Sequence, residues 1–235
     1  MTKTNEQVRT EVRTSYAEIA VGDASCCGPS PTEIGYDPTE LADLPDEVIM
    51  GLGCGNPVAF AEVSEGDTVL DLGSGGGIDV FLAARNAGDT GRVIGVDMTP
   101  EMLDRAEANA TRLGLDNVEF RRGLIEDLPV DDAAVDLVIS NCVINLAPDK
   151  APVFAEVFRV LRPGGRMVVS DLVTDGPLPD SMKDDPEAWA SCVGGALPKS
   201  DYLDLIRAAG LVDAKVLKQD DSSPVFSITV RAVRP

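Results

Sequence analysis

The chain has 235 residues and a formal net charge of −20, from 40 acidic and 20 basic side chains, and it contains no histidine. The negative charge opposes binding to nucleic acid and to the anionic surface of a membrane. The lack of histidine excludes Ser-His-Asp triads, histidine general bases and histidine-containing metal sites.

The composition favours a cytoplasmic α/β protein. Hydrophobic residues make up 44% of the chain and aromatic residues only 4%, as in parallel strands covered by helices. The opening segment is polar, no run approaches the roughly 18–20 apolar residues that span a bilayer, and the five widely spaced cysteines do not form the framework of a small secreted domain. The scattered acids, with Arg outnumbering Lys, indicate a halophilic protein.

Residues 1–60 are predicted to be an irregular N-terminal extension, in which Gly, Pro and Asp clusters surround short helical stretches such as 43–52. From residue 67, short apolar runs alternate with segments of helical periodicity, which is the pattern of successive βαβ units. Strands are predicted at 68–72, 92–98, 118–123, 135–146, 164–173, 214–219 and 224–233. Helices are predicted at 78–88, 99–114, 153–161 and 202–211, the second with Thr99 at its N-cap, Pro100 in its first turn and Gly114 after its end.

The predicted fold is a Rossmann-like, seven-stranded, mainly parallel sheet. Its last two strands form a terminal antiparallel hairpin at the sheet edge, because only the short turn 220–224 joins them. Residues 162–165 are predicted to form a turn before the fifth strand. The stretch 174–200 is long and rich in turn residues, and long insertions in compact domains are often binding loops.

A glycine-rich loop follows the first strand and opens the first helix of the sheet domain. Gly73, Gly75 and Gly77 let the backbone approach a ligand closely, while the helix N-terminus directs amide hydrogens toward it. Asp97 ends the next strand, where a carboxylate accepts hydrogen bonds from ribose hydroxyls in such folds. An NAD fingerprint would want glycine at position 78, which is Ile78 here.

The segment VLDLGSGGG resembles the first motif of the class I methyltransferases, which bind S-adenosylmethionine. The resemblance implies that residues 61–235 form a methyltransferase domain. It also implies a cofactor near Met98, near Ile125 and Glu126 in GLIEDLP, and near Asn141 at the end of the fourth strand. The cofactor-binding residues implied are Asp71, Gly73, Ser74, Gly75, Gly77, Asp97, Met98, Ile125, Glu126 and Asn141.

Three cysteines lie in segments that can converge over the carboxyl edge of the sheet. Cys142 ends the fourth strand, Cys192 lies in the insertion 174–200, and Cys54 precedes the first strand. A single cysteine in an apolar strand is more often a small buried core residue than a ligand, so the spacing alone leaves both interpretations of Cys142 open.

The segments around these cysteines resemble those of the arsenite methyltransferases. The similar segments, in chain order, are DASCCGPS, GLGCGNPVAF, SNCVINLAPDK and SCVGGAL. This resemblance implies that Cys54, Cys142 and Cys192 bind As(III), from arsenite or methylated arsenite. It further implies that Cys26 or Cys27 in the extension forms a regenerating or protective disulfide, and that an external thiol reductant, such as a thioredoxin-like protein, takes part in arsenite detoxification.

Thiolates suit this chemistry because they are soft donors that prefer soft acceptors. Three of them would leave the arsenic lone pair exposed as the nucleophile, so the reaction requires positioning and no general base. Longer members of the family carry a further C-terminal domain, which this chain is expected to lack.

Two other functions remain open at this point. The chain also resembles class I methyltransferases that act on small quinone-like or sterol-like acceptors. A non-catalytic protein that binds a metal or metalloid through thiols is the alternative from another class, although zinc sites usually show C-x₂₋₄-C pairs, which do not occur here.

Overall fold

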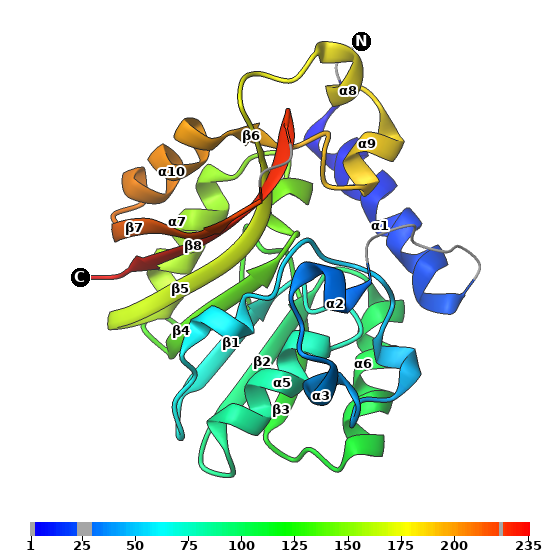
Figure 1. Cartoon of the computed structure of the whole chain (residues 1–235), viewed down its shortest axis with the longest axis vertical. Helices are drawn as coiled ribbons and strands as arrows, with labels where there is room; N and C mark the ends of the chain where they lie inside the picture. The colour runs from blue at the N-terminus through cyan, green and yellow to red at the C-terminus, as the bar shows by residue number, and fades with distance from the viewer. Residues whose placement is uncertain (1–2, 23–29, 221–222) are drawn as a thin grey trace.

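The computed structural model describes residues 3–22, 30–220 and 223–235, and it is built around one twisted sheet (Figure 1). The strand order is β3-β2-β1-β4-β5-β8-β7, and the two-residue β6 pairs with β5 beside this path. The strands are β1 (Thr68–Leu72), β2 (Arg92–Asp97), β3 (Val118–Arg122), β4 (Val135–Asn141), β5 (Leu161–Thr174), β6 (Leu197–Pro198), β7 (Val212–Gln219) and β8 (Val225–Val233).

Strands β1 to β5 pair in parallel, whereas β8 runs antiparallel to both β5 and β7. The predicted mainly parallel sheet with a terminal antiparallel hairpin is therefore confirmed. The short β6 lies inside the insertion 174–200 and was not predicted, because two residues leave no periodic signal.

Helices cover both faces of the sheet because the central strands are apolar on both sides. Val69 faces the core beneath α5, and the next residue, Leu70, faces the core beneath α7 and α10. The helical elements are α1 (Asn5–Val21), α2 (Pro31–Ile34), α3 (Pro38–Leu41), η1 (Asp46–Val48), α4 (Val58–Ala61), α5 (Ile78–Ala87), α6 (Pro100–Leu113), η2 (Ile144–Leu146), α7 (Ala151–Val160), α8 (Asp180–Lys183), α9 (Pro186–Ala190) and α10 (Lys199–Ala208).

Helix α6 has the ends that were predicted for it. Thr99 is its N-cap, Pro100 is its first residue, and Gly114 follows its end in the left-handed conformation that glycine adopts without a steric cost. The predicted turn at 162–165 differs from the structure. Here β5 already begins at Leu161, and the irregularity is a break in its register with β4, between the pairs that involve Val135 and Leu137.

The N-terminal extension is more ordered than its irregular pattern predicted. Residues 5–21 form the longest helix of the described chain, which begins with a capping box between Thr4 and Gln7. Helix α1 has few apolar residues, but Val8 and Val12 are buried because they lie one turn apart on the same face. Tertiary contacts with α6 and α9 stabilise a helix that its composition alone would not.

Three helices lie beyond the carboxyl ends of the parallel strands, at the top and right of Figure 1. They are α1 from the extension and α8 and α9 from the insertion 174–200, and α1 packs against α9. None of the helices in the described part of the chain is long and apolar enough to cross a membrane.

Candidate active site

An open cavity lies at the carboxyl edge of the sheet. It lies where the strand order reverses between β1 and β4, the usual ligand position in open α/β sheets. The loops after β1, β2, β3 and β4 all line it, together with one face of α1. Every residue predicted for cofactor binding lines the cavity except Gly77, which is the N-cap of α5 beside it.

The glycine loop closes tightly over the end of β1. A Cβ atom on Gly73 would lie 2.3 Å from the Val143 side chain after β4, so no other residue fits there without displacing Val143. Gly75 donates its backbone N–H to Asp97 Oδ2 at 3.0 Å, and Asp97 Oδ1 accepts the Thr99 N–H at 2.8 Å. These contacts hold the Asp97 carboxylate at the cavity wall.

The cavity fits a polar, nucleotide-like ligand. Ser74 is buried and lines the cavity, and its Oγ atom has no hydrogen-bond partner among the described residues. Because burying an unpaired hydroxyl is costly, this atom is suited to bond a bound molecule. Glu126 lines the same cavity with Met98 and Ile125, and its Oε1 atom accepts hydrogen bonds from both Arg9 Nε and Arg9 Nη2, at 3.0 and 2.9 Å.

Three buried or partly buried carboxyl groups face the cavity, which favours a ligand with positive charge. Burial raises the pKa of Asp71 well above its usual value, and the neighbouring Asp79 and Asp97 raise it further. Burial also raises the pKa of Asp97, and it raises the pKa of Asp79 to about 6 although hydrogen bonds from Tyr36 and Asn141 oppose the shift.

Tyr36 and Asp79 belong to a hydrogen-bonded network in the cavity lining that was not predicted from the sequence. Tyr36 donates its hydroxyl to Asp79 Oδ1 at 2.7 Å, and Asn141 Nδ2 donates to the Tyr36 hydroxyl at 2.9 Å and to the Gly55 carbonyl at 2.7 Å. The available signal was the single acid in the apolar opening of α5, since a buried charge there requires polar partners.

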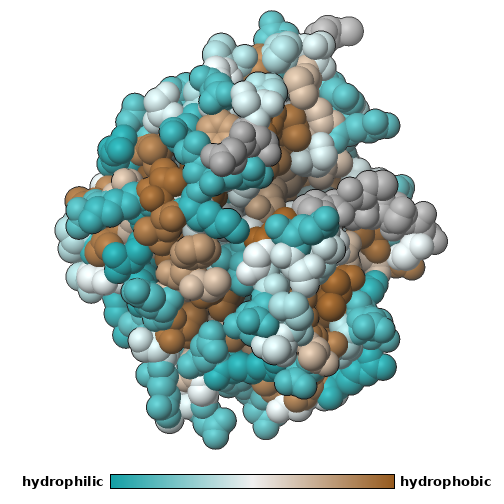
Figure 2. Space-filling model, in the orientation of Figure 1, coloured by the Kyte–Doolittle hydropathy of each residue, from teal (hydrophilic) through white to brown (hydrophobic). Residues whose placement is uncertain are grey.

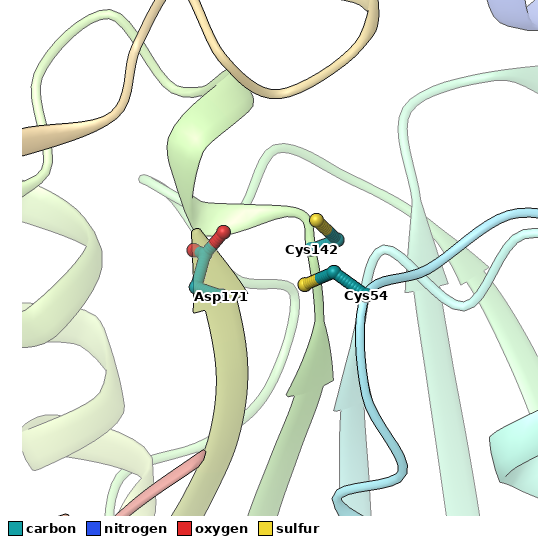
Figure 3. A group of neighbouring side chains, drawn as sticks. All are labelled: Cys54, Cys142 and Asp171. Atoms are coloured by element: carbon teal, nitrogen blue, oxygen red, sulfur yellow. The ribbon is translucent and has the colours of Figure 1, made fainter. Parts of the chain in front are cut away.

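The thiols of Cys54 and Cys142 lie side by side, with the carboxylate of Asp171 next to them (Figure 3). One ligand atom from each of these three residues lies within 4.8 Å of the others. Asp171 extends from β5 and is 1% exposed. It was not predicted, although an acid within the apolar run of β5 was a visible signal.

Cys192 lies in the same cluster of packed side chains but outside this closest group. Its Sγ atom donates to the Cys142 carbonyl oxygen at 2.7 Å and lies 3.9 Å from the Tyr16 hydroxyl. The structure therefore brings the three predicted cysteines together from the loop before β1, the end of β4 and the segment after α9. Cys26 and Cys27 lie outside the described residues.

The loop that carries Cys54 lies directly against the sheet. A Cβ atom on Gly53 would be 2.8 Å from the Asn141 amide, and one on Gly55 would be 2.6 Å from Ser170 Cβ. Cys54 donates its backbone N–H to Asn141 Oδ1 at 3.0 Å, and its carbonyl accepts the Ser227 hydroxyl at 2.7 Å. The glycines on both sides of Cys54 thus permit the approach that brings its thiol to Cys142.

Two of the three cysteines hold an unfavourable backbone conformation. The φ angles of Cys142 and Cys192 are 62° and 63°, in the left-handed region that favours glycine. Non-glycine residues there cost on the order of 1–3 kcal/mol, and such strain is concentrated at functional sites.

The thiols are protonated at neutral pH. The pKa of Cys54 is raised, chiefly by burial, and the pKa of Cys192 is raised well above its usual value by its contact with Cys142 and by burial. The contact with Cys192 lowers the pKa of Cys142, but the contact with Cys54 and burial outweigh it, so that pKa also lies well above the usual value.

Asp171 and Lys150 place opposite charges beside the thiols. Burial raises the pKa of Asp171 to about 7, against the effect of Lys150 and of hydrogen bonds from Leu172, Tyr202 and Asn145. Burial lowers the pKa of Lys150 to about 8, against the attraction of Asp171. The Lys150 ammonium lies 6.0 Å from the centre of the Trp189 ring.

Comparison with known proteins agrees with this geometry. A family model described as "Methyltransferase domain" matches residues 63–210. The arsenite methyltransferase of Halobacterium salinarum is 44% identical, with 94% of this chain and 62% of that protein covered, and the human arsenite methyltransferase is 34% identical, with 81% and 54% covered. The chain therefore spans less than two thirds of the length of either relative.

A solved structure gives the same family. The arsenic (III) S-adenosylmethionine methyltransferase from Chlamydomonas reinhardtii is 40% identical and superimposes with a TM-score of 0.70, covering 87% of this chain and 74% of that one.

Proposed function

This chain belongs to the arsenite methyltransferase family of the class I methyltransferases, and from that premise we propose that it transfers a methyl group from S-adenosylmethionine to As(III) bound by Cys54, Cys142 and Cys192. One observation carries the proposal: cysteines from three distant segments gather at the carboxyl edge of the sheet, beside the cavity that the glycine loop lines. A buried core cysteine would need neither the neighbouring thiols nor the left-handed backbone.

The cofactor-binding residues have separate tasks in this proposal. S-adenosylmethionine, when bound, supplies an electrophilic methyl group on a sulfonium. Asp97 would accept hydrogen bonds from the ribose hydroxyls. The adenine would lie among Met98, Ile125 and Glu126. Ser74 and the glycine loop would contact the methionine part. The Asp79 carboxyl group, with a pKa of about 6, is mostly ionised at pH 7 and favours the positive charge of the cofactor over neutral molecules.

The protonated thiols suit the loading of arsenite. Each thiol that binds As(OH)₃ gives its proton to a departing hydroxide, so a water molecule leaves for each As–S bond and no net proton is released. Three thiolates then hold arsenic in a pyramid with its lone pair outward. The enzyme contributes by aligning that lone pair with the methyl group of the cofactor, so that the displacement occurs between two reactants that are already held in place.

The reaction needs electrons, because methylation raises the oxidation state of arsenic by two. We assign their supply to two cysteine thiols, which form a disulfide, and to an external thiol reductant that opens it. Cys26 or Cys27 would form this bridge with Cys54 or Cys142. The assignment is tested by mapping disulfides by mass spectrometry after one turnover without reductant.

The same proposal extends to the setting of the enzyme. Working thiols require a reducing compartment, which supports the cytoplasm and a role in arsenic detoxification. The net charge of −20 supports a halophilic host, and Figure 2 shows hydrophilic residues around the rim of the face, with hydrophobic residues between them.

Methyl transfer from labelled S-adenosylmethionine tests the function. The unchanged protein, assayed with arsenite and a dithiol at molar salt, is expected to form methylated arsenic. Cys142→Ser is expected to lose that product, at least a hundred-fold, and to keep cofactor binding, because only the thiolate set is broken.

Ser191→Ala provides a matched control, since Ser191 is exposed beside Cys192 and bonds only its own helix. Product from Cys142→Ser at the unchanged rate would refute the thiolate site. Cofactor binding without any arsenic product from the unchanged protein would indicate a class I methyltransferase with an organic acceptor.

A further inference from the structure

Helix α1 contacts both halves of the active site. Arg9, Val12 and Tyr16 all line the cavity, and they lie three and four residues apart on one face of the helix. The apolar residues Val8 and Val12 pack in the cluster that holds Cys142, Cys192 and Trp189. Figure 1 shows α1 alongside α9, beyond the strand ends.

At the cofactor half, α1 is held by an ion pair. Both bonds from Arg9 end on Oε1 of Glu126, whose side chain is 10% exposed. The other carboxylate oxygen, Oε2, has no hydrogen-bond partner among the described residues. Arg9 therefore orients Glu126 and leaves one oxygen open for a donor such as the adenine amino group.

At the arsenic half, α1 is held through Tyr16. Its hydroxyl donates to the Ala190 carbonyl at 3.3 Å, at the end of α9, and lies 3.9 Å from Cys192 Sγ. Tyr16 thus contacts both the thiol and the backbone that carries it. Tyr16 follows Arg9 by seven residues within one continuous helix, a rise of about 10 Å, so a shift at one residue is passed to the other.

We propose that Arg9 and Tyr16 are positioning residues that couple the two ligands: cofactor binding fixes Glu126 and α1, and α1 then holds Cys192 in place for arsenic. The inference rests on the proposed function. It adds that each ligand stabilises the same docked position of α1, so each binds more tightly in the presence of the other, and by linkage the two factors are equal.

Titrations of the whole protein with S-adenosylhomocysteine and arsenite measure this coupling without turnover. Calorimetry gives the Kd of S-adenosylhomocysteine with and without saturating arsenite. Fluorescence of Trp189, the one tryptophan of the chain, reports arsenite binding because its ring packs with Cys142 and Cys192. We expect arsenite to lower the Kd of the unchanged protein by about five-fold or more.

Tyr16→Phe and Arg9→Gln are expected to reduce the ratio of the two Kd values of S-adenosylhomocysteine, without and with arsenite, to below two. Arg9→Lys is expected to restore part of this ratio. The controls are Ser15→Ala, which removes a hydroxyl bonded only within α1, and Arg13→Gln, which removes an exposed charge. Both controls should keep the full factor. A merely structural role would change the single-ligand Kd values and leave their ratio unchanged.

The possible failures are distinguishable. If both ligands bind independently in the unchanged protein, or if Tyr16→Phe and Arg9→Gln keep the full factor, the coupling is refuted and the proposed function stands. If arsenite leaves Trp189 fluorescence and the calorimetric signal unchanged at every concentration, the proposed arsenic site itself is refuted and the coupling with it.

Discussion

The Asp79 carboxyl group connects cofactor binding to pH. With a pKa of about 6, it is mostly protonated at pH 5 and mostly ionised at pH 7, and only the ionised form attracts the positive charge of the cofactor. We therefore expect the Kd for S-adenosylmethionine to fall by about ten-fold between pH 5 and pH 7. Calorimetry across this range measures the change.

Asp79→Asn should flatten this profile, because an amide does not titrate. Asp89→Asn is the matched control, since Asp89 is exposed and distant from the cavity lining. If the Kd for S-adenosylmethionine still falls steeply with pH in Asp79→Asn, the titrating group is Asp71 or Asp97 instead.

Some residues of the site could be found from the sequence and others could not. The glycine loop follows a predicted strand, Asp97 and Cys142 lie near the carboxyl ends of two others, and the ends of parallel strands meet at one edge. Asp171 and Asp79 are single acids within apolar runs, which signals a buried carboxyl group but does not show which cavity it lines. Tyr16 has no local signal, because its partner Cys192 is 176 residues away.

Among the elements, the loop 51–57 depends on the small size of Gly55. Gly55→Ala would force a Cβ atom to within 2.6 Å of Ser170 Cβ, so the loop must move away from β5 and take the Cys54 thiol with it. We expect arsenite affinity to fall by at least ten-fold, with a loss of stability of about 1–3 kcal/mol. Trp189 fluorescence and thermal unfolding measure the two effects.

Gly176→Ala is the control for this change, because a Cβ atom there meets nothing within 4 Å. It should leave both quantities unchanged. Unaltered arsenite affinity in Gly55→Ala would mean that the loop position does not set the thiol geometry.

The elements of the sheet were predictable because their periodicity is strong. The strands and helices that were predicted from residue 68 onward appear in the predicted order, and α6 has its predicted caps, whereas the short elements η2, α8, α9 and β6 were not predicted. Helix α1 was missed because it buries only a few residues, and its stability comes from α6 and α9, which are distant in sequence. The early start of β5 was missed because Pro163, Gly164 and Gly165 are typical turn residues.

For the whole molecule, the charge of −20 predicts a strong dependence of stability on salt. Repulsion among exposed acids opposes the compact state. Salt screens this repulsion, because the Debye length falls from about 10 Å at 0.1 M to about 3 Å at 1 M salt. We expect Tm to rise by roughly 4–8 °C over this range, equivalent to about 2 kcal/mol. Calorimetry in NaCl and KCl measures it.

Asp89→Lys, which reduces the net charge to −18 at an exposed position, should weaken the salt effect. A Tm that does not change with salt, or an identical slope in this variant, would remove charge repulsion as the cause.

Because of the left-handed backbone at Cys142 and Cys192, selection for stability and selection for activity favour different residues at these positions. Glycine at either position would relieve strain, so a library screened only for folding should drift away from cysteine at both. Survival on arsenite would be the only pressure that retains them. A sequence redesigned on this backbone for stability would therefore lose its arsenic ligands at two positions where the backbone itself favours glycine.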